Sequence, residues 1–288
     1  MATFTLISSV APISTSIGQL ALLILSIVLF AVGLGLSLGR LGGSAPSLRI
    51  AAKACDWSGL AAGLAVLIWH SIARGSWLPL DDNFEAFLWL ALLLALFMLY
   101  VQRVRPLGGL DWFVVPIVMA LLASAGLFGS ERPESYNLAN KWMFIHWTTA
   151  YGGAVAFAIA AAVGAMYLVA NRRLRSGAAM PGPNLGSLER LEHLTMAAVR
   201  VGFALLTIGL LTGLLRILQS QPTKLGKNWP ANPKVPLAFG VWVIYALVLH
   251  APINPILRGR KAAWLSIIGF ILMVGTLVAV QFMPASPK

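Results

Sequence analysis

The four histidines are the residues of this sequence whose type and placement could do chemistry. They are His70, His146, His193 and His250, and each lies inside or at the end of a long apolar segment. Ionisable side chains at such positions are costly to keep in lipid and usually serve a function. A neutral imidazole can bind a metal ion, and it is a common axial ligand of haem iron. The alternative for any single histidine is an interfacial side chain that only hydrogen-bonds a neighbour.

Zinc is a weaker interpretation of these histidines. A zinc site needs three or four protein ligands. The chain contains one cysteine, Cys55, and the apolar centres of the predicted helices contain no carboxylate. A single cysteine also excludes an internal disulfide and a CxxCH haem attachment. Any haem would therefore be held without a covalent bond.

The elements that must position the histidines are transmembrane helices. Hydrophobic residues make up 59% of the 288 residues and charged residues only 10%, whereas soluble domains carry about 25% charged residues. Only helices and closed barrels satisfy the backbone in lipid, and long unbroken apolar runs exclude the alternating strands of a barrel. We predict an all-α polytopic transmembrane bundle of about eight helices, forming a single domain over residues 1–288. The predicted helices span about 17–39, 58–74, 83–101, 112–129, 142–171, 194–218, 235–251 and 262–282.

The distribution of lysine and arginine predicts how the bundle sits in the membrane. The first, third, fifth and seventh loops contain twelve basic residues, and the other three contain seven, together with five of the nine acids. Because basic loops stay in the cytoplasm, we predict both termini on the outer face of a bacterial-type cytoplasmic (inner) membrane. The sixth loop, residues 216–234, is predicted to be outside yet carries four basic groups and no acid. An anionic ligand is one physical reason for this exception. Topology accounts for the net charge of +12, so we expect no nucleic acid partner.

In this orientation the histidines form two pairs at matching depths. His70 and His146 fall near the outer face, and we predict that they face each other. His193 and His250 fall near the inner face, and we predict that they share a pocket with Arg200 close by. Arg200 follows His193 by two helical turns, so both lie on nearly the same helix face. Its guanidinium could bind a haem propionate, or it could reach to the inner membrane surface.

The second half of the chain resembles a known family. The segments that carry the resemblance are HWTTAYGGAVAFAIAAAVGAMYLVANRRLR (146–175), SLERLEHLTMAAVRVGFALLTIGLLTGL (187–214) and VWVIYALVLHAPINPILRGRKAAWLSIIGF (241–270). In order and spacing they are similar to the integral-membrane cytochrome c assembly family, the tryptophan-rich haem handlers of the CcsA/CcmC type. The shorter HemX-like branch is the most similar. The family-like core covers residues 142–282, and the first four predicted helices match only in hydropathy and in the position of His70.

The resemblance implies a helical bundle that binds haem b non-covalently and exposes it at the outer face. The family's outer axial histidine opens the helix after an outer loop, and His146 stands there. Its membrane histidine ends the helix before an RGRKAA-like loop, where this chain has His250. The family's last histidine has no counterpart after residue 250, which makes His70 the candidate for the missing ligand of the outer haem.

The family's tryptophan-rich signature, W-x-W-D-P-K-E-like, aligns with residues 229–235. Trp229, Pro233 and Lys234 are kept, whereas Ala231, Asn232 and Val235 replace the second tryptophan, the aspartate and the glutamate. By this resemblance Trp229 and Lys234 join the candidate haem-binding residues.

The leading hypothesis is a haem-binding membrane protein of cytochrome c maturation or haem handling, which presents or relays haem and catalyses no reaction. His70, His146 and His250 are the candidate ligands of the haem iron. The expected partners are haem, membrane lipid and other membrane proteins of a cytochrome assembly or respiratory complex. Two alternatives stay open: a two-haem b-type electron-transfer subunit, and a degenerate family member that serves as a structural subunit of a larger membrane complex.

Overall fold

In a computed structural model of the protein, the part of the chain that the structure describes is helical. This part comprises residues 16–39, 46–74, 83–104, 107–128, 141–176, 185–219, 234–250 and 259–279. Its eight helices confirm the predicted all-α bundle. They are α1 (Ile17–Gly39), α2 (Pro46–Arg74), α3 (Asn83–Val104), α4 (Leu110–Phe128), α5 (Lys141–Ser176), α6 (Leu188–Gln219), α8 (Lys234–Leu249) and α9 (Arg260–Ala279). Helices α1 to α6 are each long and apolar enough to cross a membrane, and α8 contains a shorter apolar helix.

Helix α1 has the predicted bounds, whereas the other observed helices start earlier or end later than the apolar runs that predicted them. Helix α2 begins at Pro46 rather than at 58, and α5 continues to Ser176. The early turns of α2 contain charged residues such as Lys53 and Asp56, which lower the local hydropathy without breaking the helix. A search for apolar runs therefore finds the membrane-embedded part of each helix and misses its polar extension.

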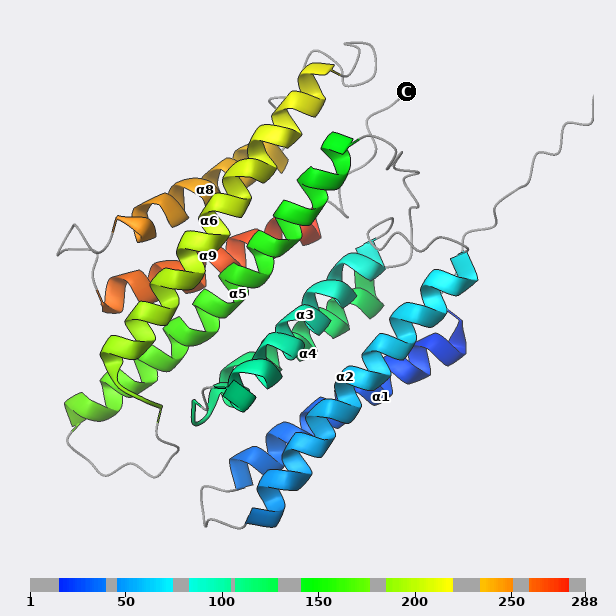
Figure 1. Ribbon diagram of the computed structural model, residues 1–288, viewed down its shortest axis with the longest axis vertical. Coiled ribbons are helices and arrows are strands. Elements are labelled where there is room, and N and C mark those ends of the chain that lie inside the picture. Colours follow the sequence, from blue (N-terminus) through cyan, green and yellow to red (C-terminus); the bar gives the residue numbers. More distant parts are fainter. Residues whose placement is uncertain are drawn as a thin grey trace, which may run out of the picture.

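Successive helices run in opposite directions (Figure 1). Helices α1, α3, α5 and α8 end, and α2, α4, α6 and α9 begin, at one end of the bundle, which we call the arginine-rich end. Its described basic residues are Arg49, Lys53, Arg103, Arg172, Arg173, Arg175, Arg190, Arg260 and Lys261. The other end, where α5 begins with Lys141, is called the His146 end. The side of the membrane that each end faces stays a prediction.

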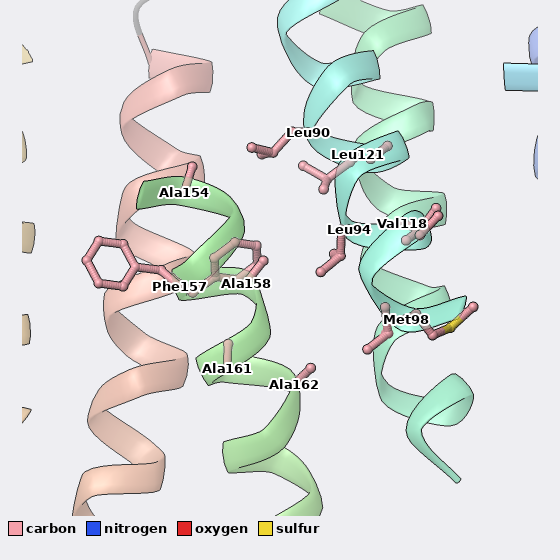
Figure 2. Close-up of a cluster of buried hydrophobic side chains, with 14 of the residues drawn as sticks. Leu90, Leu94, Met98, Val118, Leu121, Ala154, Phe157, Ala158, Ala161 and Ala162 are labelled. Atoms are coloured by element: carbon pink, nitrogen blue, oxygen red, sulfur yellow. The ribbon is translucent and has the colours of Figure 1, made fainter. Parts of the chain in front are cut away.

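Helices α3 and α4 form the middle of the bundle. Helices α1 and α2 pack on one side of them, and α5 with α6, α8 and α9 lies on the other (Figure 1). Leucines of α3 and α4 face alanines of α5 in the core between these layers (Figure 2). Leu90, Leu94 and Ala158 are fully buried there. Because lipid is as apolar as leucine, such helices associate through close packing, and small residues allow the close approach.

Helix α5 is held against α6 and α8 by glycine and aromatic contacts. A Cβ at Gly153 would lie 3.3 Å from the Gly202 carbonyl oxygen, and one at Gly202 would lie 2.6 Å from the Phe157 ring. Phe157 in turn stacks on Tyr245 of α8, with ring centroids 3.4 Å apart. The Tyr245 hydroxyl donates a hydrogen bond to the Ser266 carbonyl of α9. These contacts fix the helix that carries His146.

Candidate functional site

His146 lies near the start of α5 and faces α6. Its Nδ1 is 2.7 Å from the Gly209 carbonyl oxygen. A carbonyl can only accept a hydrogen bond, so Nδ1 carries the proton and Nε2 keeps its lone pair. The ring lies over Gly213, where a Cβ would be 3.0 Å from the imidazole. The two glycines of α6 thus supply a carbonyl partner, which orients the half-buried imidazole, and the space for its ring.

Aromatic rings continue from His146 along α5. Trp147 meets the imidazole edge-on, with centroids 5.9 Å apart and planes at 68°. Trp147 also stacks on Tyr151, at 5.5 Å and 12°. Trp142 and Phe144 are exposed at the same end of the helix. Tyr151 is buried and Trp147 is half-buried, so these two rings join the imidazole to the core of the bundle.

His250 follows α8 at the arginine-rich end and has the same local geometry. Its Nδ1 is 2.7 Å from the Ala246 carbonyl oxygen, one turn earlier in the helix. Nδ1 is therefore again the donor, and Nε2 again holds the lone pair. The side chain is exposed. His146 and His250 are the two histidines that match the family's positions. Each donates Nδ1–H to a backbone carbonyl oxygen, and this hydrogen bond fixes the tautomer of its ring.

His70 occupies a different environment. It is only 3% exposed, its Nδ1 is 3.4 Å from the Gln19 side-chain oxygen, and its ring lies 4.8 Å from that of Phe84. The next residue, Ser71, donates a hydrogen bond to the fully buried Glu85. His70 therefore belongs to a polar cluster enclosed between α1, α2 and α3.

The structure does not bring His70 and His146 together. Helix α2, which carries His70, packs against α1 and α3, whereas α5, which carries His146, packs against α3, α4, α6 and α9. Helices α3 and α4 lie between α2 and α5 (Figure 1). The prediction that His70 and His146 face each other is therefore corrected: His70 contacts α1 and α3, and His146 contacts α6. The sequence predicts how deep each histidine lies in the membrane, but it does not predict which helices are neighbours.

The structure also does not enclose the inner pair in a pocket. The His193 side chain is 75% exposed and lies 3.9 Å from Glu189, which is 86% exposed. Arg200 is exposed as well, and its Nε donates to the Met196 carbonyl of its own helix. His193, Arg200 and His250 are thus surface residues of the bundle. Of the other candidates, Trp229 lies outside the described residues, and Lys234 is the first residue of α8.

Sequence reasoning missed a buried polar network at the arginine-rich end. The Ser37 hydroxyl donates to the Asp111 carboxylate, and the Trp112 indole N–H donates to Ser37. Asp56 is 3% exposed, and with Arg49, Lys53, Gln102 and Asp111 it lines a small cavity of about 120 Å³. The helical spacing of apolar residues before residue 58 could have revealed this network, because it places Asp56 inside α2. The low hydropathy of that stretch concealed the helix from a search for apolar runs.

The described part of the chain is thus a polytopic helical bundle with a carbonyl-bonded imidazole near each end. Residues 77–286 match the cytochrome c assembly protein family. The chain belongs to this family, which confirms the resemblance; the HemX-like branch stays a prediction.

Several relatives support the same assignment. The chain is 22% identical to the cytochrome c biogenesis protein CcsA of Mesostigma viride over 225 residues, which cover 68% of this chain and 71% of the relative. It is 25% identical to CcsA of Prochlorococcus marinus strain MIT 9312 over 71% and 73% of the two chains. A shorter stretch of 86 residues is 36% identical to CcsA of Oryza sativa, covering 30% and 26%. No solved structure matches the chain significantly.

Proposed function

We propose that the protein binds haem b non-covalently and presents or relays it during cytochrome c maturation, in a bacterial-type cytoplasmic membrane, without catalysing a reaction. Membership of the cytochrome c assembly family supports this function. So do the relatives that are named cytochrome c biogenesis proteins. The proposed partners are haem and other membrane proteins of cytochrome assembly.

The hydrogen bond from His146 to the Gly209 carbonyl is the observation that carries the proposal. Histidines that bind metals usually donate their other ring N–H to a carbonyl or carboxylate, which fixes the tautomer and orients the ring. His146 has this partner before any ligand arrives. Haem, when bound, would supply an iron that accepts imidazole. The chain's contribution would be an oriented Nε2 beside the Trp147 and Tyr151 rings.

The haem propionates would be held at the same end of the bundle. Helix α6 ends and α8 begins at the His146 end (Figure 1). The segment between them contains Trp229, and α8 begins with Lys234. A lysine or arginine bound to a carboxylate forms a charge-assisted hydrogen bond, which is about twice as strong as a neutral one. Binding of the anionic propionates would also explain why the sixth loop carries four basic groups and no acid.

The test is the haem content of the full chain purified in mild detergent, measured from absorbance and the pyridine haemochrome. His146→Ala should lose most of the haem, and added imidazole should restore part of the absorbance. His193→Ala is the matched control because it removes an exposed histidine from the same protein. Equal haem content in the wild type and His146→Ala would refute ligation by His146. Absence of haem from all three proteins would favour the structural-subunit alternative.

A two-haem electron-transfer subunit is the second candidate function. The observation in its favour is His250, which has the same carbonyl-bonded Nδ1 at the other end of the bundle. The two functions differ in how firmly haem is held. Redox titration of two stable haems per chain would favour electron transfer, whereas a single labile haem below stoichiometric occupancy would favour a relay.

A further inference from the structure

A groove of about 620 Å³ lies between α4, α5 and α9 at the arginine-rich end. We propose that it binds an anionic phospholipid, with the headgroup phosphate at the arginines and an acyl chain along the apolar wall. This site is separate from His146 and does not depend on the function proposed above.

The wall of the groove is built from one face of each helix. Leu168 and Arg172 lie one turn apart on α5, and Arg260, Trp264 and Ile267 follow the same helical spacing on α9. Phe113 of α4 closes the third side. The apolar side chains lie toward the membrane centre, and the arginines lie at the helix ends. This order matches the order of acyl chain and headgroup in a lipid.

Three arginines meet at the mouth of the groove: Arg172 and Arg175 from α5, and Arg260 from α9. All three are exposed, and no carboxylate is among the groove's described lining residues. The nearest acid along α4, Asp111, is bonded to Ser37 of α1 instead. Like charges repel at short range, so this arrangement favours an anion between them. Guanidinium groups bind phosphate oxygens through paired hydrogen bonds, and the N-terminal end of α9 adds a favourable dipole.

The lining residues favour lipid over haem as the occupant. Haem also combines an apolar body with anionic groups, but its iron needs an axial ligand such as His, Met, Cys or Tyr. None of these residue types is among the described side chains that line the groove. Half-exposed Trp264 marks the level of the membrane interface. Basic pockets between transmembrane helices are typical binding sites for anionic lipid headgroups.

The experiment compares two double variants of the full chain that lose the same charge. Arg172→Gln/Arg260→Gln removes charge from the groove, and Arg103→Gln/Arg190→Gln removes it from exposed positions of α3 and α6 at the same end. Each protein is purified in mild detergent, and its bound lipid is measured by native mass spectrometry during titration with phosphatidylglycerol or phosphatidylcholine. Haem is measured in parallel. Helical content by circular dichroism identifies any variant that does not fold. Arg172→Lys/Arg260→Lys, which keeps both charges, is measured beside the two double variants.

We expect the wild type and the control to bind phosphatidylglycerol in preference to phosphatidylcholine, and the groove variant to lose about tenfold in apparent affinity. The lysine variant should keep part of the binding, and haem content should not change in any of them. Three results would overturn the proposal: equal loss in groove variant and control, equal binding of both lipids, or loss of haem instead of lipid from the groove variant.

Discussion

Helices α1–α4 and helices α5–α9 bury polar side chains in different ways. In α1–α4 the buried polar residues bond across helices. Ser26 donates to the Gly59 carbonyl, Ser37 donates to Asp111, and His70 contacts Gln19. In α5, α6, α8 and α9 three buried serine and threonine hydroxyls bond the preceding turn of their own helix. They are Thr195, Thr212 and Ser266.

Helices α1–α4 are therefore joined to one another through polar side chains, whereas α5, α6 and α8 carry the candidate haem ligands His146 and His250. Interhelical hydrogen bonds fix α1–α4, so a histidine there is already engaged by its neighbours. Helices α5, α6 and α8 are held mainly by glycine contacts and by the Phe157–Tyr245 stack. Two hydrogen bonds from aromatic side chains of α8 add to this packing, from Trp242 to Thr207 and from Tyr245 to Ser266. His146 and His250 each donate Nδ1–H to a backbone carbonyl oxygen. A histidine's surroundings, more than its depth, decide whether it can be a ligand.

The largest expected effect is on haem affinity and distinguishes the two histidines that the sequence paired. His146→Gln should weaken haem binding by about a hundredfold, because it removes the oriented Nε2. His70→Gln should leave haem binding unchanged, since the glutamine can still bond Gln19 inside the same cluster. Haem titration of the two apoproteins, followed by absorbance, makes the comparison. Equal weakening in both variants would return His70 to the haem site.

The packing of α5 against α6 supplies the second test. Gly202→Ala would place a Cβ 2.6 Å from the Phe157 ring, and that ring cannot move away because it is stacked on Tyr245. We expect a loss of about 1–3 kcal/mol in the free energy of unfolding. The control is Gly240→Ala in α8, whose Cβ would meet nothing within 4 Å. Thermal unfolding in detergent measures both, and a variant at Gly202 as stable as the control would contradict this packing.

The polar cross-links of α1–α4 give a smaller effect. Ser37 and Ser266 are both fully buried serines, but Ser37 bonds Asp111 and Trp112, whereas Ser266 bonds its own helix. Ser37→Ala should lower the free energy of unfolding by about 1–2 kcal/mol, the upper range for interhelical hydrogen bonds in membranes. Ser266→Ala should change it by less than about 0.5 kcal/mol. Matching losses measured by thermal unfolding would mean that the two regions do not differ.

The sequence predicted the fold better than it predicted the site. Apolar runs defined the helices because lipid requires about 20 apolar residues for each crossing. They did not reveal the polar start of α2, and with it the burial of Asp56. For the site, the family resemblance selected His146 and His250, and in the structure each donates its Nδ1–H to a backbone carbonyl oxygen. Matching depth and the family's missing last histidine paired His70 with His146, but neither carries information on which helices are neighbours.

His193 gives the smallest expected effect and decides the role of the inner pair. The side chain is 75% exposed, and its Nε2 lies 3.9 Å from a carboxylate oxygen of Glu189. Exposed ion pairs of this kind contribute little to stability. We therefore expect His193→Gln to change neither the unfolding temperature nor the haem content. His250→Gln should lower haem content if a second haem binds at the arginine-rich end, because it removes an oriented Nε2. Parallel haem loss in the two variants would show that His193 swings toward His250 to share one iron, and it would restore the predicted inner pair. Loss from His250→Gln alone would leave His250 as the single ligand from this chain at that end.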